Sequence, residues 1–69
     1  MTVLEFVNMY GAESDTAGIN IFSTGYMEEF VYSDFKDEAI LEQFKILFNR
    51  KVDMFSIGCT GALNIITVR

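Results

Sequence analysis

Hydrophobic and polar residues recur along the chain with two different periods, and each change of period marks an element. The first helical pattern begins at Thr2, which is followed three residues later by Glu5 as in a capping box. Apolar residues continue to Tyr10, and Gly11 suits the left-handed position that follows a helix. This pattern predicts a short helix over residues 3–10.

A second helical pattern lies in the middle of the chain and is the stronger of the two. Asp37 and Glu38 stand near its start, where negative charge suits the helix dipole. Asn49 is expected to end this helix in a left-handed conformation. The apolar stripe has the spacing i, i+1, i+4, i+7 and i+8 and consists of Ile40, Leu41, Phe44, Leu47 and Phe48.

Two pairs of segments alternate with period two, as strands do. Residues 19–23 and 26–32 are separated by Thr24-Gly25, and residues 52–57 and 62–68 by a four-residue loop. Each pair predicts a hairpin. The order helix, hairpin, helix, hairpin predicts one α+β domain over residues 1–69, with the arrangement αββαββ. We expect a four-stranded antiparallel sheet with both helices packed on one face.

The segment 26–32 carries glutamates on both of its faces, so neither face has the composition of a core. This composition predicts either an edge strand or a strand that is covered on both sides. On an edge strand, charges also discourage unwanted pairing. Alternation assigns the side chains of this strand to two faces, one with Met27, Glu29 and Val31 and the other with Tyr26, Glu28, Phe30 and Tyr32.

Charge is distributed unevenly along the chain, whose net charge is −5. Residues 13–42 hold eight acids against Lys36, whereas residues 43–69 hold four bases, Lys45, Arg50, Lys51 and Arg69, against Asp53. Binding of a phosphate backbone requires clustered cations, so the acidic half argues against direct nucleic-acid binding. It favours a protein partner with a basic surface.

The residue types needed for catalysis are scarce. The chain has no His and one cysteine, Cys59, and its acids lack the spacing of a calcium loop. We therefore expect neither an enzyme nor a metal or cofactor site. No run of eighteen apolar residues and no signal peptide is visible, which predicts no membrane span. A lone cysteine fits a cytoplasmic location.

Aromatic rings and carboxylates gather between residues 26 and 42, a combination typical of protein recognition. Three uses remain open: a partner surface, rings that cover the helices beside solvated acids, or a homodimer formed through Tyr26 and Phe30. For the partner surface we predict two anchors, Tyr26 and Tyr32, and six steering carboxylates, Glu28, Glu29, Asp34, Asp37, Glu38 and Glu42.

Three stretches, MTVLEFV (1–7), EQFKILFNRKV (42–52) and GALNIITV (61–68), resemble very small acidic proteins encoded by bacteriophages and other mobile elements. Some members of that class are anti-CRISPR proteins. The resemblance implies an acidic DNA mimic that occupies the DNA-binding cleft of a Cas effector in the host cell. The sequence thus favours a non-catalytic inhibitor of a host nucleic-acid-binding protein. The alternative is a self-associating structural or accessory phage module.

Overall fold

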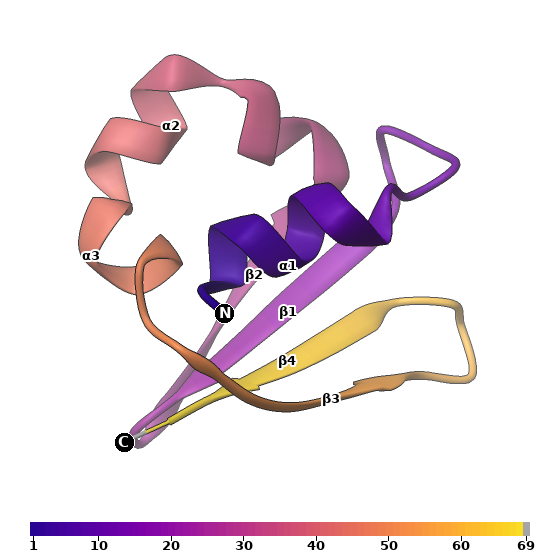
Figure 1. Cartoon of the computed structure of the whole chain (residues 1–69). Helices are drawn as coiled ribbons and strands as arrows, with labels where there is room; N and C mark the ends of the chain where they lie inside the picture. The colour runs from indigo at the N-terminus through magenta and orange to yellow at the C-terminus, as the bar shows by residue number, and fades with distance from the viewer. Residues whose placement is uncertain (69) are drawn as a thin grey trace.

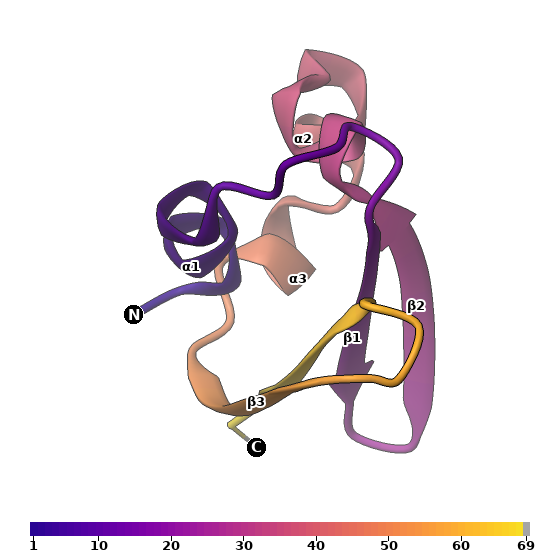
Figure 2. The same ribbon diagram turned by 90° about the vertical axis from the view of Figure 1, so that its right-hand side faces the viewer.

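A computed structural model describes residues 1–68 of the chain. The elements are helix α1 (Val3–Tyr10), strands β1 (Gly18–Ser23) and β2 (Tyr26–Val31), the 3-10 helix η1 (Tyr32–Lys36), helices α2 (Glu38–Gln43) and α3 (Lys45–Phe48), and strands β3 (Val52–Ile57) and β4 (Leu63–Thr67). The helices lie on the concave side of a strongly twisted sheet (Figures 1 and 2). The expected small α+β domain with a four-stranded sheet is confirmed.

Helix α1 begins and ends as its sequence predicts. The hydroxyl of Thr2 accepts the N–H of Glu5, and the Glu5 carboxylate accepts the N–H of Thr2, at 3.2 and 2.9 Å. The backbone N–H of Thr2, and then its hydroxyl, lower the pKa of Glu5. Gly11 follows the helix with φ of 60°, a conformation that glycine adopts at no steric cost.

The expected antiparallel sheet is wrong, because the sheet is mixed. Its order is β2-β1-β4-β3, and the central strands β1 and β4 run parallel, with Ile19 beside Leu63 and Ile21 beside Ile65. Helices α2 and α3 return the chain to the end of the sheet where β2 began (Figure 1). Strand β3 therefore runs in the direction of β2, and its hairpin partner β4 runs in the direction of β1.

The expected αββαββ arrangement also needs correction in its second helix. This region divides into η1, α2 and α3, and the chain turns out of helical geometry at Phe44, with φ of −108° and ψ of 26°. Asn49 ends α3 without a left-handed backbone, at φ of −94°. Its side-chain amide instead donates to the carbonyl of Lys45 at 2.9 Å.

The core lies between the helices and the two central strands. The predicted apolar stripe faces it, with Leu47 and Phe48 buried and the rest of the stripe packed against the buried cluster. The ring of Phe30 on β2 meets Phe44 and Phe48 at centroid distances of 5.0 and 5.1 Å. Such edge-to-face contacts anchor β2 beneath the helices.

Arg50, at the start of the second hairpin, closes one end of the sheet. Its guanidinium donates to the Val68 carbonyl at 2.9 Å and to the Thr67 hydroxyl at 3.3 Å. The buried Thr67 hydroxyl in turn donates to the Phe22 carbonyl at 3.2 Å. Because these bonds join β1 and β4, the end of the sheet near Phe22 is held in place.

Candidate protein-binding surfaces

Two of the predicted steering carboxylates bind the backbone. Asp34 accepts the N–H of Val31 at 2.9 Å, where β2 ends. Asp37 is the N-cap of α2 and accepts the N–H groups of Ala39 and Ile40 at 2.9 and 3.4 Å. Short acidic side chains satisfy such free amides well. Asp34 and Asp37 thus have a structural role whether or not they meet a partner.

The two predicted aromatic anchors differ in exposure. Tyr26 is 58% exposed at the start of β2. Tyr32 is half-buried and packs against the core, with the ammonium of Lys36 4.8 Å from its ring centroid. Phe30, the second residue of the homodimer face that the sequence left open, is buried among the rings of the core, so its ring is not on the surface.

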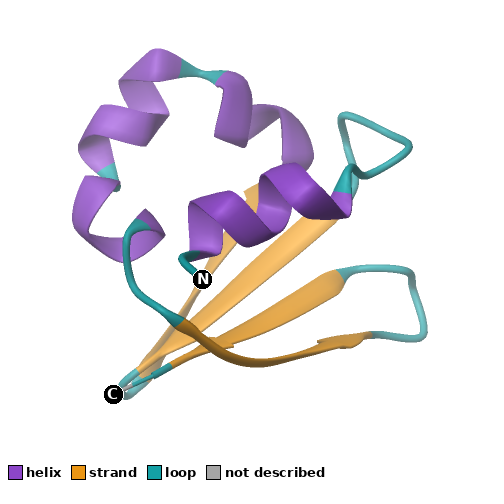
Figure 3. Ribbon diagram, viewed as in Figure 1, coloured by secondary structure: helices purple, strands orange, loops and turns teal. Residues whose placement is uncertain are grey.

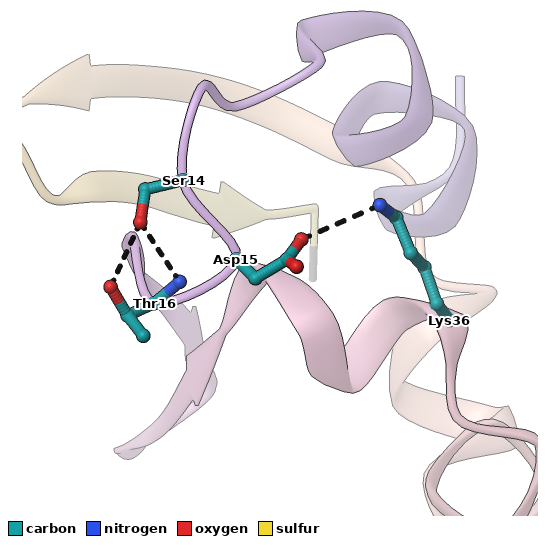
Figure 4. A network of polar contacts seen from close by, with 4 residues as sticks. All are labelled: Ser14, Asp15, Thr16 and Lys36. Atoms are coloured by element: carbon teal, nitrogen blue, oxygen red, sulfur yellow. Dashed lines mark hydrogen bonds and ion pairs between the residues drawn. The ribbon is translucent and has the colours of Figure 1, made fainter.

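Lys36 is the one base of the acidic half, and its ammonium lies 3.5 Å from the carboxylate of Asp15 (Figure 4). Both side chains are largely exposed, so this pair contributes little to stability. It is the single ion pair among residues 1–68. Within that range the carboxylates of Glu28, Glu29, Glu38 and Glu42 therefore have no basic partner.

The acidic residues do not gather in one patch. Glu28 lies on the helix side of the sheet and Glu29 on the opposite side, as alternation predicts. Glu38 and Glu42 lie together on α2, beside a shallow groove of about 300 Å³ lined by Leu4, Leu41, Lys45, Phe48 and Asn49. The turn before Tyr26 is at the opposite end of the molecule from α2 (Figures 1 and 2).

The convex side of the sheet is a second candidate surface. All helices lie on the other side (Figure 3), so the side chains that point away from them have no described element over them. Strand pairing aligns four of these side chains in one row that crosses all four strands. Every member is apolar and partly exposed: Met27 by 41%, Phe22 by 36%, Ile66 by 38% and Met54 by 57%. We call these four residues the apolar row.

The next row on the convex side is polar. Its members follow from the same pairing and are Glu29, Asn20, Asn64 and Ser56. The amide of Asn20 donates to the side-chain oxygen of Asn64 at 3.0 Å, which joins the two central strands. The polar row therefore borders the apolar row on one side and places one carboxylate, that of Glu29, beside it.

The sequence contained a signal for the apolar row. INIF (19–22) and LNII (63–66) are similar tetrapeptides, and in the sheet they lie side by side in register. Both end in an apolar residue, Phe22 or Ile66, on the face opposite to the buried isoleucines. The parallel pairing that brings these two residues together was not expected, so the row was missed.

The remaining features of the chain are an exposed cysteine, the arrangement of possible metal ligands and the length of the helices. Cys59 is exposed in the loop between β3 and β4. Within residues 1–68, no three His, Cys, Asp or Glu side chains are grouped as a metal ion would require. None of the helices in that range has the length and apolarity to cross a membrane.

Comparison with protein-family models, curated proteins and solved structures gives no match.

Proposed function

We propose that the chain is a non-catalytic protein-binding module and that the convex side of its sheet is the binding face. The observation that carries the proposal is the apolar row, four partly exposed side chains in a line across the sheet. Contiguous apolar surface of this kind is typical of interaction sites. A short chain that leaves it open forgoes burial that would stabilise the domain.

The geometry of the row indicates the kind of partner. Side chains opposite one another on neighbouring strands have Cβ atoms about 5 Å apart, so the four form a continuous strip. A helix or a second sheet with apolar side chains can lie across such a strip. The polar row provides a hydrophilic rim, and the Glu29 carboxylate favours a partner with a basic group at that position.

The proposal is tested by removing the two row members on the edge strands. In M27S/M54S both apolar side chains are shortened, whereas Ile46→Ser changes an 85% exposed side chain outside the row. Proteins captured from a bacterial lysate by each variant are quantified, and the dissociation constant of any purified partner is measured by calorimetry. We expect at least about tenfold weaker binding for M27S/M54S and none of that loss for I46S. Equal binding by all three proteins would contradict the proposal.

An inhibitor of a host nucleic-acid-binding protein, such as a Cas effector, is the second candidate. It is favoured by the four glutamates that lack a basic partner among residues 1–68 and by the exposed Tyr26. Cytoplasmic action belongs to this proposal and is supported by the lone Cys59. Phage origin remains a prediction from the resemblance.

This second candidate has its own test. The variant E28Q/E29Q/E38Q/E42Q removes four charges and retains Asp34 and Asp37, which bind the backbone. Against a purified Cas nuclease, an acidic mimic should associate more slowly as salt rises, and the Gln variant should associate slowly at every salt concentration. Association that depends on neither salt nor these glutamates would exclude the acidic mechanism.

A further inference from the structure

Strand β3 forms one edge of the sheet, and most of that edge is open. The segment Met1–Val3 covers only its beginning, where the Val52 N–H donates to the Met1 carbonyl and the Val3 N–H to the Arg50 carbonyl. Beyond a register shift between Val52 and Met54, β3 pairs with β4 alone. The open edge therefore runs from Asp53 to Ile57.

Hydrogen-bond alternation identifies the groups along this edge. The Gly58 N–H donates to the Ala62 carbonyl, so Ser56 and Met54, two and four residues earlier, also exchange bonds with β4. Phe55 and Ile57 lie between these positions and direct their N–H and C=O groups away from β4. No other residue within 1–68 pairs with those groups.

From Met54 to Ile57 the open edge lacks the features that normally prevent pairing, because the covering segment, the register shift and Asp53 are all at its start. Natural edge strands carry charges, prolines or a covering segment. Here Asp53 is the single charged residue, and it lies at the register shift. Met54, Phe55 and Ile57 are all more than half exposed. The Phe55 ring lies 4.8 Å from that of Phe6, so α1 holds its inner side while the rest faces solvent.

We propose that this edge pairs with the same edge of a second copy, antiparallel about a two-fold axis at Ser56. In this register Phe55 of each copy lies opposite Ile57 of the other, so each of these residues exchanges both its N–H and its C=O. The contact is isologous, because the same groups bind on both sides. It extends the two four-stranded sheets into one.

Chemistry favours this occupant and this register. In this register the apolar side chains of Phe55 and Ile57 lie opposite each other. Asp53 lies opposite Cys59 of the second copy, so no acidic residue faces it. A register with Phe55 opposite itself would instead set Asp53 against Ile57. Asp53 is the one charged residue of the open edge, and in this register the two Asp53 carboxylates lie at opposite ends of the paired segment.

The two-fold axis also explains the exposed side chains beside the edge. Because it stands perpendicular to the sheet, the helices of both copies lie on the same side. Phe55 and Ile57 of both copies then form one apolar strip between the two α1 helices. Pairing of five residues buries on each copy roughly half of the 800 Å² per partner that is typical of a standard interface. Because interfaces of this size are weak, we expect a dimer that forms only at micromolar concentration.

Sedimentation with a matched pair of variants tests the dimer. Ile57→Lys places a charge on the open edge, and Ile46→Lys places the same charge on α3, where the side chain is 85% exposed. We expect I57K to raise the dissociation constant of the dimer more than about tenfold, with I46K behaving as wild type. Circular dichroism checks that both variants are folded. A wild-type protein that stays monomeric at high micromolar concentration would overturn the proposal.

A disulfide tests the register without disturbing the apolar residues. Ser56 would face itself in a non-hydrogen-bonded pair, with Cα atoms about 4.5 Å apart, which is within disulfide range. In a Cys59→Ser background we expect Ser56→Cys to cross-link rapidly under mild oxidation, and Ser33→Cys, at another exposed serine, to do so slowly. Equal rates, or a dimer that Ile57→Lys leaves intact, would show that another surface is used.

This inference is independent of the proposed binding face. A failed partner test with M27S/M54S leaves the sedimentation result unchanged, and a monomer leaves the convex apolar row available.

Discussion

The two edges of the sheet differ in how they are protected. Strand β2 carries the charges of Glu28 and Glu29. At its end the Asp34 carboxylate accepts a hydrogen bond from the Val31 N–H, which would otherwise be free to bind a new strand. Strand β3 has one charged residue, Asp53, and its apolar residues from Met54 to Ile57 are exposed. Edge strands invite pairing unless charge or a cap blocks it. The comparison indicates that one edge of this domain is closed to other chains and the other is open.

The difference extends to packing. The helices cover β2 through Phe30, which is 8% exposed, whereas Phe55 on β3 is 53% exposed although both rings point to the helix side. A chain of 69 residues has few elements with which to cover a sheet. The helices pack mainly on the central strands and on β2, and β3 is contacted only at its margin, where Phe6 of α1 meets Phe55.

The largest expected effect comes from truncating these two rings. Phe30→Ala removes a ring that contacts three others, and we expect a loss of about 3–5 kcal/mol in the free energy of unfolding. Phe55→Ala should cost about 1–2 kcal/mol, because half of that ring is already in solvent. Urea unfolding at low protein concentration, where dimers are absent, measures both. Equal losses would mean that the two edges are packed alike.

A smaller effect is expected where β2 is capped. Asp34→Ala leaves the Val31 N–H without its acceptor, and we expect a loss of about 1 kcal/mol. Asp34→Asn keeps an oxygen at that position and should lose less. Urea unfolding gives the stability, and sedimentation shows whether D34A gains a second self-association edge. If D34A and D34N have the stability of wild type, the cap does not contribute.

The smallest effect concerns the segment that covers the start of β3. Thr2→Ala removes the N-cap of α1 and should cost about 1 kcal/mol or less in the free energy of unfolding.

The pKa of Glu5 is lowered from 4.5, so the contribution of this carboxylate to stability is present above that pH and is lost as the pH falls through the lowered value. Stability measured by urea unfolding between neutral and acidic pH should fall less steeply in Glu5→Gln. An identical slope in wild type and E5Q would contradict this assignment.

Local features of the fold could be predicted from the sequence, since short-range chemistry determines them. The capping box at Thr2, the stripe ending at Phe48 and both hairpin turns were all identified correctly. The edge position of β2 also followed from its glutamates. The parallel pairing of β1 with β4 was missed because it depends on the path of a helical crossover, which no local pattern records.

The candidate site was harder to predict for the same reason. Alternation correctly separated Glu28 from Glu29, but it could not reveal that the start of β2 and helix α2 lie at opposite ends of the molecule. The apolar row exists only through pairing between residues far apart in the chain, such as Phe22 and Ile66. The exposure of Phe55 likewise depends on which strand the helices leave uncovered.

Amide hydrogen exchange at several protein concentrations tests the difference between the edges most directly. We predict that the amides of Phe55 and Ile57 exchange rapidly in dilute solution and become protected as concentration rises through the micromolar range. The outward amides of Met27 and Glu29 on β2 should exchange rapidly throughout. Protection of the β2 amides instead, or no dependence on concentration at Phe55 and Ile57, would contradict the open edge.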